Sequence, residues 1–256
     1  MVLGFIGTGK IASSVVDGIF KSKLKKSKIL LSLRNKKISS NLKRKFKKIE
    51  ILKNNQDIIN RSHLIFLAVT PSVGEKILGN LKFSKNKKII SFISTINLAN
   101  LKKLTKCKDI VRAIPLPPIE IKKGPIIICP PNKQAKQFFS HLGSVVEISN
   151  EKICNKFWST SALMAPFYEL LNVSTQWLVN KGVNNAKATS YISELFLGLS
   201  QDAVNKKSKG LKKLVLESQT PKGLNEQALR QLKKSKFYSK LNDTLNSIYK
   251  RMSKAK

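Results

Sequence analysis

The residues whose types and spacing most directly predict chemistry form the segment Gly7-Thr8-Gly9-Lys10-Ile11-Ala12. It follows an apolar run, Val2–Ile6, and opens an amphipathic stretch, Ile11–Phe20, so the pattern predicts a strand, a tight turn and a helix. Gly7 permits the turn, Gly9 lets the backbone approach a pyrophosphate, and Ala12 allows close packing of helix on strand. Free N–H groups at the helix N-terminus would attract the phosphates. The segment therefore predicts a nicotinamide dinucleotide site.

The choice between the two nicotinamide dinucleotides is made after the second strand. An acidic residue there would accept hydrogen bonds from the ribose and indicate NAD. The sequence instead has Arg34-Asn35-Lys36-Lys37 and no carboxylate. Arg34 can grip a 2′-phosphate with two parallel hydrogen bonds, so NADP(H) is favoured over NAD(H). The alternative is that these cations merely reflect a lysine-rich composition.

Two further strand ends are expected at the same crevice, because ligands of this type of sheet bind beyond the carboxyl ends of its strands. The apolar run Leu64–Val69 is followed by Thr70 and Pro71, and Ala68, Val69 and Pro71 should border the nicotinamide. The segment from Arg112 through Pro115 to Pro118 follows another strand and should border the same crevice.

Apolar runs alternate with helical stretches through the first half of the chain, which predicts an α/β fold with a Rossmann-type, doubly wound parallel sheet. The expected strands are Val2–Ile6, Lys28–Leu33, Ile49–Leu52, Leu64–Val69, Lys88–Ile93, Ile110–Ala113, Ile126–Cys129 and Val145–Ile148. From residue 150 onward only helices are expected: Phe157–Lys181, Ala186–Asn205, Leu211–Ser218, Leu224–Lys234 and Phe237–Met252. We therefore expect a dinucleotide-binding domain at 1–149 and an all-helical dimerisation and substrate domain at 150–256.

The formal charge of +35 suggests nucleic-acid binding, but only six of the 49 basic side chains are Arg and the lysines run through the whole chain. Base readout and stacking favour Arg, so nucleic acid is not favoured as a partner. No apolar run approaches the roughly 20 residues that cross a membrane, and no secretory signal is expected. Three scattered cysteines and two histidines have no metal-ligand spacing. We expect no metal and a reducing, cytoplasmic compartment.

These motifs together resemble the pyrroline-5-carboxylate reductase family. The resemblance covers nearly the whole chain: GFIGTGKIASSVVDG at the start, AVTP, RAIPLPP followed by Gly124, APFY, and TPKGLNEQAL near the end. It implies a domain that binds NAD(P)H and a helical domain that forms an intertwined dimer or higher homo-oligomer. The reaction it implies is hydride transfer to the cyclic imine 1-pyrroline-5-carboxylate, which gives proline. A protonated imine is already electrophilic, so positioning it against the nicotinamide supplies much of the catalysis.

The sequence departs from the family where the family holds the substrate carboxylate. The family's Asn-Thr-Pro is replaced by Leu116-Pro117-Pro118, and its Ser-Gly-Ser-Gly-Pro-Ala-Tyr by residues 162–168, which read ALMAPFY. The first threonine of its Pro-Gly-Gly-Thr-Thr turn has become Leu224. Several hydroxyls are lost together, which predicts a rebuilt substrate pocket beside a retained cofactor site. The expected substrate-binding residues are Arg112, Pro115, Ser161, Met164, Gly223, Leu224 and Asn225.

No residue is identified as the general acid, and the candidates are Tyr168, Glu169 and Asn225. Glu169 would need burial to act, and an ordinary exposed helix carboxylate is the alternative. Three functions stay open: reduction of 1-pyrroline-5-carboxylate or a close cyclic imine, reduction of a different imine or carbonyl compound by a diverged paralogue, and a non-catalytic dinucleotide-binding or basic interaction protein. The first makes the chain an NADP(H)-dependent oxidoreductase of proline biosynthesis.

Overall fold

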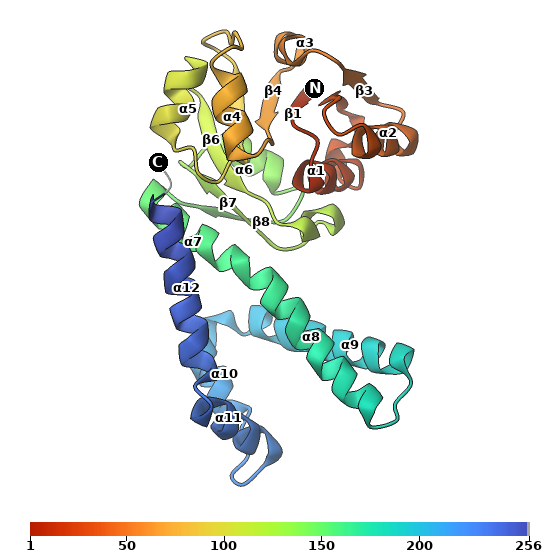
Figure 1. Ribbon diagram of the computed structural model, residues 1–256, viewed down its shortest axis with the longest axis vertical. Coiled ribbons are helices and arrows are strands. Elements are labelled where there is room, and N and C mark those ends of the chain that lie inside the picture. The colour runs from red at the N-terminus through yellow and green to blue at the C-terminus, as the bar shows by residue number, and fades with distance from the viewer. Residues whose placement is uncertain (255–256) are drawn as a thin grey trace. The chain divides into compact units, whose positions relative to one another are not determined.

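The computed structural model describes residues 1–254 and consists of two compact units (Figure 1). The first comprises Met1–Ser159 together with residues 249–254, and the second is Thr160–Ile248. The sequence places the boundary near residue 149, before helix α7 (Glu151–Thr160). In the structure α7 belongs with the first unit, because Cys154 is buried in its core.

The first unit is built around one eight-stranded sheet with the order β3-β2-β1-β4-β5-β6-β7-β8. Strands β1 to β6 are parallel, whereas β7 runs antiparallel to β6 and parallel to β8. The strands are β1 (Val2–Ile6), β2 (Lys28–Ser32), β3 (Ile49–Leu52), β4 (Leu64–Leu67), β5 (Lys88–Ser91), β6 (Ile110–Ile114), β7 (Pro125–Cys129) and β8 (Ser144–Glu147).

The Rossmann-type, doubly wound α/β fold expected from the sequence is confirmed, and the sheet is parallel except where β7 pairs with β6. Only residues 115–124 connect β6 to β7, and they contain the short 3-10 helix η2 (Pro117–Ile121). A parallel return usually needs a crossover of a dozen or more residues. The shorter connection reverses the chain, and β7 therefore pairs antiparallel.

Both faces of the sheet are covered, because successive side chains of its buried strands point to opposite sides. Leu3, Phe5 and Phe66 pack on one face, and Ile6 and Leu67 on the other. The helices on the first face are α1 (Lys10–Phe20), α2 (Lys36–Lys45) and α6 (Lys133–Phe139). Those on the second are α3 (Asn55–Arg61), α4 (Pro71–Leu78) and α5 (Leu98–Thr105).

The second unit is helical, as the sequence predicts, although the single helix expected over Phe157–Lys181 is interrupted. The short 3-10 helix η3 (Ser161–Leu163) separates α7 from α8. The remaining helices are α8 (Met164–Asn180), α9 (Asn185–Asn205), α10 (Leu211–Glu217), α11 (Leu224–Lys234) and α12 (Phe237–Lys254), with the 3-10 helix η4 (Lys207–Lys209) between α9 and α10.

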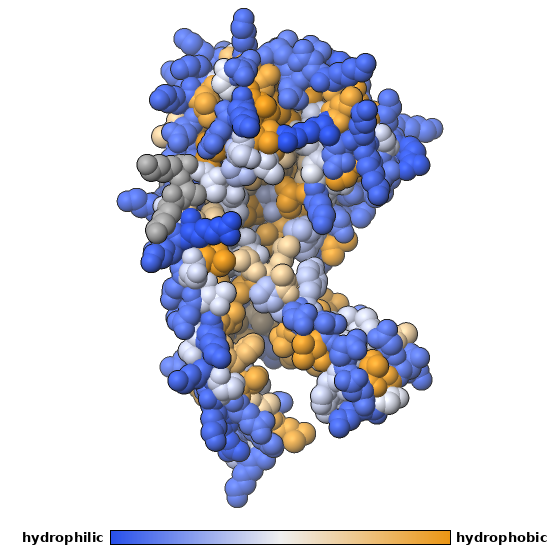
Figure 2. Space-filling model, viewed as in Figure 1, coloured by the Kyte–Doolittle hydropathy of each residue, from blue (hydrophilic) through white to orange (hydrophobic). Residues whose placement is uncertain are grey.

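These helices leave much apolar surface uncovered in the single chain. Trp177 is 60% exposed and Leu199 is 59% exposed, and only Ala188 and Ile192 of the 21-residue α9 are buried. Figure 2 shows apolar patches among hydrophilic residues. Apolar surface of this extent marks an interaction face. Among residues 1–254, no helix is both long enough and apolar enough to span a lipid bilayer.

Candidate functional site

The turn between β1 and α1 is shaped by two glycines with different roles. Gly7 has a φ of +99°, and a Cβ on it would stand 2.5 Å from the carbonyl oxygen of Ala68. Gly9 is the N-cap of α1, and a Cβ on it would meet no atom within 4 Å. No side chain caps α1, so no side-chain oxygen competes for the N–H groups of its first turn. The turn thus presents backbone donors to open space, where an anion is favoured.

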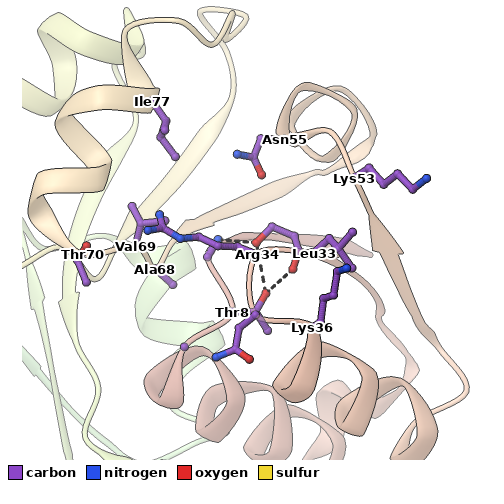
Figure 3. A pocket seen from close by; sticks show the side chains of 14 residues that line it. Thr8, Leu33, Arg34, Lys36, Lys53, Asn55, Ala68, Val69, Thr70 and Ile77 are labelled. Carbon is purple, nitrogen blue, oxygen red and sulfur yellow. Dashed lines mark hydrogen bonds between the residues drawn. The ribbon is translucent and has the colours of Figure 1, made fainter.

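The turn is tied to the neighbouring strand by the last residue of β2. Ser32 Oγ accepts a hydrogen bond from the backbone N–H of Gly7 at 2.9 Å, and the hydroxyl of Thr8 donates to the Ser32 carbonyl at 2.8 Å. Figure 3 marks the bonds at Thr8 with dashed lines. Thr8 and Ser32 are both buried. The hydroxyl proton of Thr8 is therefore used inside the protein.

A cavity of about 830 Å³ opens beside this turn at the carboxyl edge of the sheet. Seven of the eleven residues predicted to bind the cofactor line it: Gly7, Thr8, Gly9, Arg34, Asn35, Ala68 and Val69. The other four, Lys10, Ile11, Ala12 and Pro71, do not. Ala12 is buried where α1 packs on the sheet, and Pro71 is the first residue of α4. As direct cofactor ligands all eleven remain predictions.

The cavity has a cationic side formed by Arg34, Lys36 and Lys53, and no carboxylate lines it. Arg34 lies among the labelled side chains of Figure 3, exposed to solvent. Lys36 begins α2, whose first turn has no acidic residue, and the Asn35 side chain caps this helix by accepting from the Ile38 N–H at 3.1 Å. Cations at the positive end of a helix dipole repel it. A bound anion would relieve this repulsion.

The sequence prediction missed Lys53 and Asn55, which also line the cavity. Lys53 follows β3 directly, and Asn55 begins α3. A signal was available, because β3 was expected and the carboxyl ends of parallel strands share one edge. What was lacking was the strand order, which places β3 beside β2.

Arg112, predicted to bind substrate, is held inside the first unit. Its side chain is 1% exposed. Its NH1 donates to Glu151 Oε1 at 2.5 Å, its NH2 donates to the Ser94 carbonyl at 2.5 Å, and its guanidinium carbon lies 4.9 Å from the centre of the Trp158 ring. Neither Arg112 nor Pro115 lines the cavity. Burial and pairing do not support the predicted role of Arg112 as a substrate ligand.

The other predicted substrate residues lie in the second unit, at the starts of helices. Ser161 begins η3 and Met164 begins α8. Gly223 is the N-cap of α11, and Leu224, its first residue, is 83% exposed. Asn225 donates from Nδ2 to the Ser218 carbonyl at 3.0 Å. That these residues form one substrate site with the first unit remains a prediction.

Two candidates for a general acid lie on the surface of α8. Tyr168 is 56% exposed. Glu169 is exposed, and its Oε2 accepts a hydrogen bond from Asn172 Nδ2 at 3.3 Å. In the single chain Glu169 is thus in the position of an ordinary helix carboxylate. A role as an acid would require a partner surface to cover it.

Comparisons with known proteins match both units. Residues 2–97 match the family model "NADP oxidoreductase coenzyme F420-dependent", and residues 158–255 match "Pyrroline-5-carboxylate reductase dimerisation". A pyrroline-5-carboxylate reductase 3 of Danio rerio is 30% identical over 131 residues, which are 49% of this chain and 44% of that protein. A pyrroline-5-carboxylate reductase of Synechocystis is 26% identical over 155 residues, 57% of this chain and 58% of the relative. The chain therefore matches about half the length of these curated relatives.

Solved structures share the fold over nearly the whole chain. The 1-pyrroline-5-carboxylate reductase of Streptococcus pyogenes gives a TM-score of 0.84 at 20% identity and covers 98% of both chains. The pyrroline carboxylate reductase of Plasmodium falciparum, solved with NADP bound, gives 0.85 at 20% identity over 98% of this chain and 97% of that one.

Fold and site together define a Rossmann-type dinucleotide fold followed by a helical dimerisation domain. The two family models match consecutive parts of the chain and the curated relatives agree with them. The chain is therefore similar to pyrroline-5-carboxylate reductases, and its residues 158–255 match the dimerisation domain of that family.

Proposed function

We propose that this protein is an NADP(H)-dependent reductase that transfers hydride to the C=N bond of a cyclic imine, 1-pyrroline-5-carboxylate or a close analogue. The observation that carries the proposal is the cavity at the glycine turn, which has backbone donors at one side and Arg34 and Lys36 at another. The similarity to pyrroline-5-carboxylate reductases supports the reaction class. A structural neighbour solved with NADP bound supports the cofactor.

The residues present fit a phosphorylated dinucleotide. The open space at Gly9 and the free first turn of α1 suit the pyrophosphate. Arg34 and Lys36 suit the 2′-phosphate, because Arg can bind a phosphate with two hydrogen bonds. Ala68 and Val69, at the end of β4, would border the nicotinamide. The bound cofactor supplies the hydride, and the protein binds it, orients it and excludes water.

We infer that the working form is a homodimer or a higher homo-oligomer built through residues 151–256. The exposed apolar side chains of α8 and α9 and the matched dimerisation model support this. The location we propose is cytoplasmic, because Cys107, Cys129 and Cys154 are free, as expected in a reducing compartment.

A second candidate is a diverged paralogue that reduces a different imine or carbonyl compound. Met164 and Leu224 stand where the family has hydroxyl-bearing residues, and both are apolar. A buried carboxylate without donors is strongly disfavoured. The same fold occurs in a reductive aminase from Aspergillus terreus solved with NADPH and ethyl levulinate, at a TM-score of 0.59 and 14% identity. This candidate predicts weak turnover of 1-pyrroline-5-carboxylate and better turnover of a bulkier or less anionic compound.

Steady-state oxidation of NADPH by the purified protein distinguishes these candidates. A kcat/KM for 1-pyrroline-5-carboxylate within about 10⁴–10⁸ M⁻¹s⁻¹ would establish the family reaction. A far lower value, with NADPH still bound and another imine reduced, would support the paralogue. The double change Met164→Ser and Leu224→Thr should then raise the value, and Leu211→Ser with Leu216→Thr on α10 is the matched control. If the protein bound NADPH but oxidised it with none of the imine and carbonyl compounds tested, it would be a non-catalytic dinucleotide-binding protein.

A further inference from the structure

An ion pair between the buried Arg112 and the partly exposed Glu151 holds the loop that follows β5. This loop, residues 92–97, connects β5 to α5. Arg112 on β6 donates to the carbonyl of Ser94 within the loop at 2.5 Å. Glu151 on α7 accepts from the backbone N–H of Leu98, the first residue of α5, at 2.9 Å. The same Glu151 Oε1 accepts from Arg112 at 2.5 Å. The ion pair thus contacts the loop within its length, at Ser94, and directly after it, at Leu98.

The ion pair leaves the Arg112 guanidinium no surface at which to bind a ligand. The side chain is 1% exposed, and both of its terminal nitrogens donate inside the protein. Trp158 covers one face of the guanidinium. The same NH1 also donates a longer hydrogen bond, of 3.5 Å, to Asn155 Oδ1. Any effect of Arg112 on a ligand must therefore pass through the groups that it holds.

The 92–97 loop in turn supports one wall of the cofactor cavity. Ile93 and Ile96 are buried, and a Cβ on Gly74 of α4 would lie 2.9 Å and 3.1 Å from their Cδ1 atoms. This Cβ position on Gly74 is also 3.6 Å from Cγ2 of Val69, and Val69 lines the cavity. The Phe92 N–H donates to the Leu67 carbonyl at 2.9 Å, directly before Ala68. The loop and the cavity wall therefore meet around Gly74, and Ile93, Ile96 and Val69 belong to one apolar cluster.

We propose that Arg112 and Glu151 are positioning residues that hold the 92–97 loop and, through Ile93 and Ile96, keep Val69 and the end of β4 in place for the cofactor. This inference rests on the proposed function for its cofactor. Packed interiors transmit displacement because they have little free volume. Changes in such a network alter binding at a connected site by about 2- to 30-fold. We expect an effect of that size on the KM for NADPH, with a smaller effect on kcat at saturating cofactor.

Variants can separate positioning from general support of the fold. Arg112→Met alone leaves Glu151 without its partner, which is strongly destabilising in a buried pair. Arg112→Met with Glu151→Met removes both charges and should recover most of the unfolding free energy. Glu151→Gln leaves the buried Arg112 charge without its carboxylate, so it should lower the unfolding free energy. It keeps an oxygen acceptor for Leu98 and Arg112, so the loop should still be held, and it is the conservative variant for the loop. Lys136→Met with Glu147→Met removes another ion pair of the first unit and is the matched control.

Two measurements decide the matter. Hydrogen exchange of a peptide spanning residues 92–98 in cofactor-free protein should become faster in the double Arg112/Glu151 variant and stay unchanged in Glu151→Gln and in the control. The KM for NADPH should rise in the same variant alone. A double variant with wild-type loop exchange and wild-type KM would overturn the proposal and leave a pair that only supports the fold.

Hydrogen exchange of residues 92–98 is measured without cofactor, so this test is independent of the proposed function. If the wild-type protein did not bind NADPH at all, the proposed function would fail. Hydrogen exchange in the cofactor-free protein would still show whether the ion pair holds the loop. If Arg112→Met did not fold, the double variant and Glu151→Gln would supply the comparison.

Discussion

The carbonyl oxygen of Ala68, just beyond β4, lies 2.5 Å from the point where a Cβ on Gly7 would stand. The turn after β1 and the end of β4, separated by 60 residues in sequence, therefore approach so closely that only glycine fits at position 7. A Cβ on Gly9 would have no atom within 4 Å. The first glycine is required by the protein itself, and the second leaves room for a ligand.

This contrast predicts different outcomes for two alanine variants. Gly7→Ala should destabilise the fold by roughly 1–3 kcal/mol, because Ala at positive φ is strained and its Cβ strikes backbone. Gly9→Ala should lower NADPH affinity with little loss of stability, because its Cβ points into the space that the pyrophosphate would occupy. Urea unfolding and NADPH titration of both variants check this. Equal stability of the two variants would contradict the assignment.

Arg34→Ala should weaken NADPH binding selectively. The loss of a charge-assisted contact to the 2′-phosphate should cost roughly 1.5–3 kcal/mol, while NADH affinity should change little. Titration of both cofactors against wild type and variant measures this. Lys37→Ala is the matched control, because Lys37 is exposed and does not line the cavity. Equal affinity of the wild type for NADPH and NADH would refute the role of Arg34.

The protein should sediment as a dimer or larger at low micromolar concentration, because α8 and α9 expose more apolar surface than a stable monomer usually does. Trp177→Glu should shift the equilibrium toward monomer, since an interface would bury the introduced charge. Asn41→Glu on α2 makes the same change of charge outside the helical unit and should have no effect. A well-folded wild-type monomer at this concentration would rule out the dimer.

Glu50 should contribute stability that depends on pH. Hydrogen bonds from Arg61 and Lys28, at 2.7 Å and 2.8 Å, lower its pKa from 4.5 to about 2. The folded-state pKa is below the unfolded value, so the stabilisation is complete above pH 4.5 and is lost as pH falls through 2. The carboxylate is at the surface, so Glu50→Gln should cost less than about 1 kcal/mol at neutral pH.

Urea unfolding at pH 7 and near pH 2 tests this expectation. The difference between wild type and Glu50→Gln should shrink at the lower pH. Glu75→Gln, which removes an exposed carboxylate of α4 without an ion pair among the described residues, is the control. A difference that stayed constant with pH would show that the lowered pKa of Glu50 does not stabilise the fold.

The sequence by itself determined the features that depend on neighbours along the chain. The turn from β1 into α1 is specified by Gly7 and Gly9, and the place of Arg34 follows from the end of β2. The strands were recognised because apolar runs bounded by polar residues are a local signal. The helix α11 has the bounds expected, Leu224–Lys234, because a Pro-Lys-Gly break precedes it. Helices α3 to α6, at seven or eight residues each, were too short to show a clear period.

Only the tertiary structure decided which distant residues meet. The order of the sheet brings Lys53 and Asn55 to the cavity, and the short connection after β6 turns β7 antiparallel. The pairing of Arg112 with Glu151, 39 residues further along the chain, was not predicted from the sequence. The physical reason is the same in each case. Hydrophobic periodicity and turn chemistry act over a few residues, whereas strand order, burial and the partner of a charge follow from packing between segments far apart in sequence.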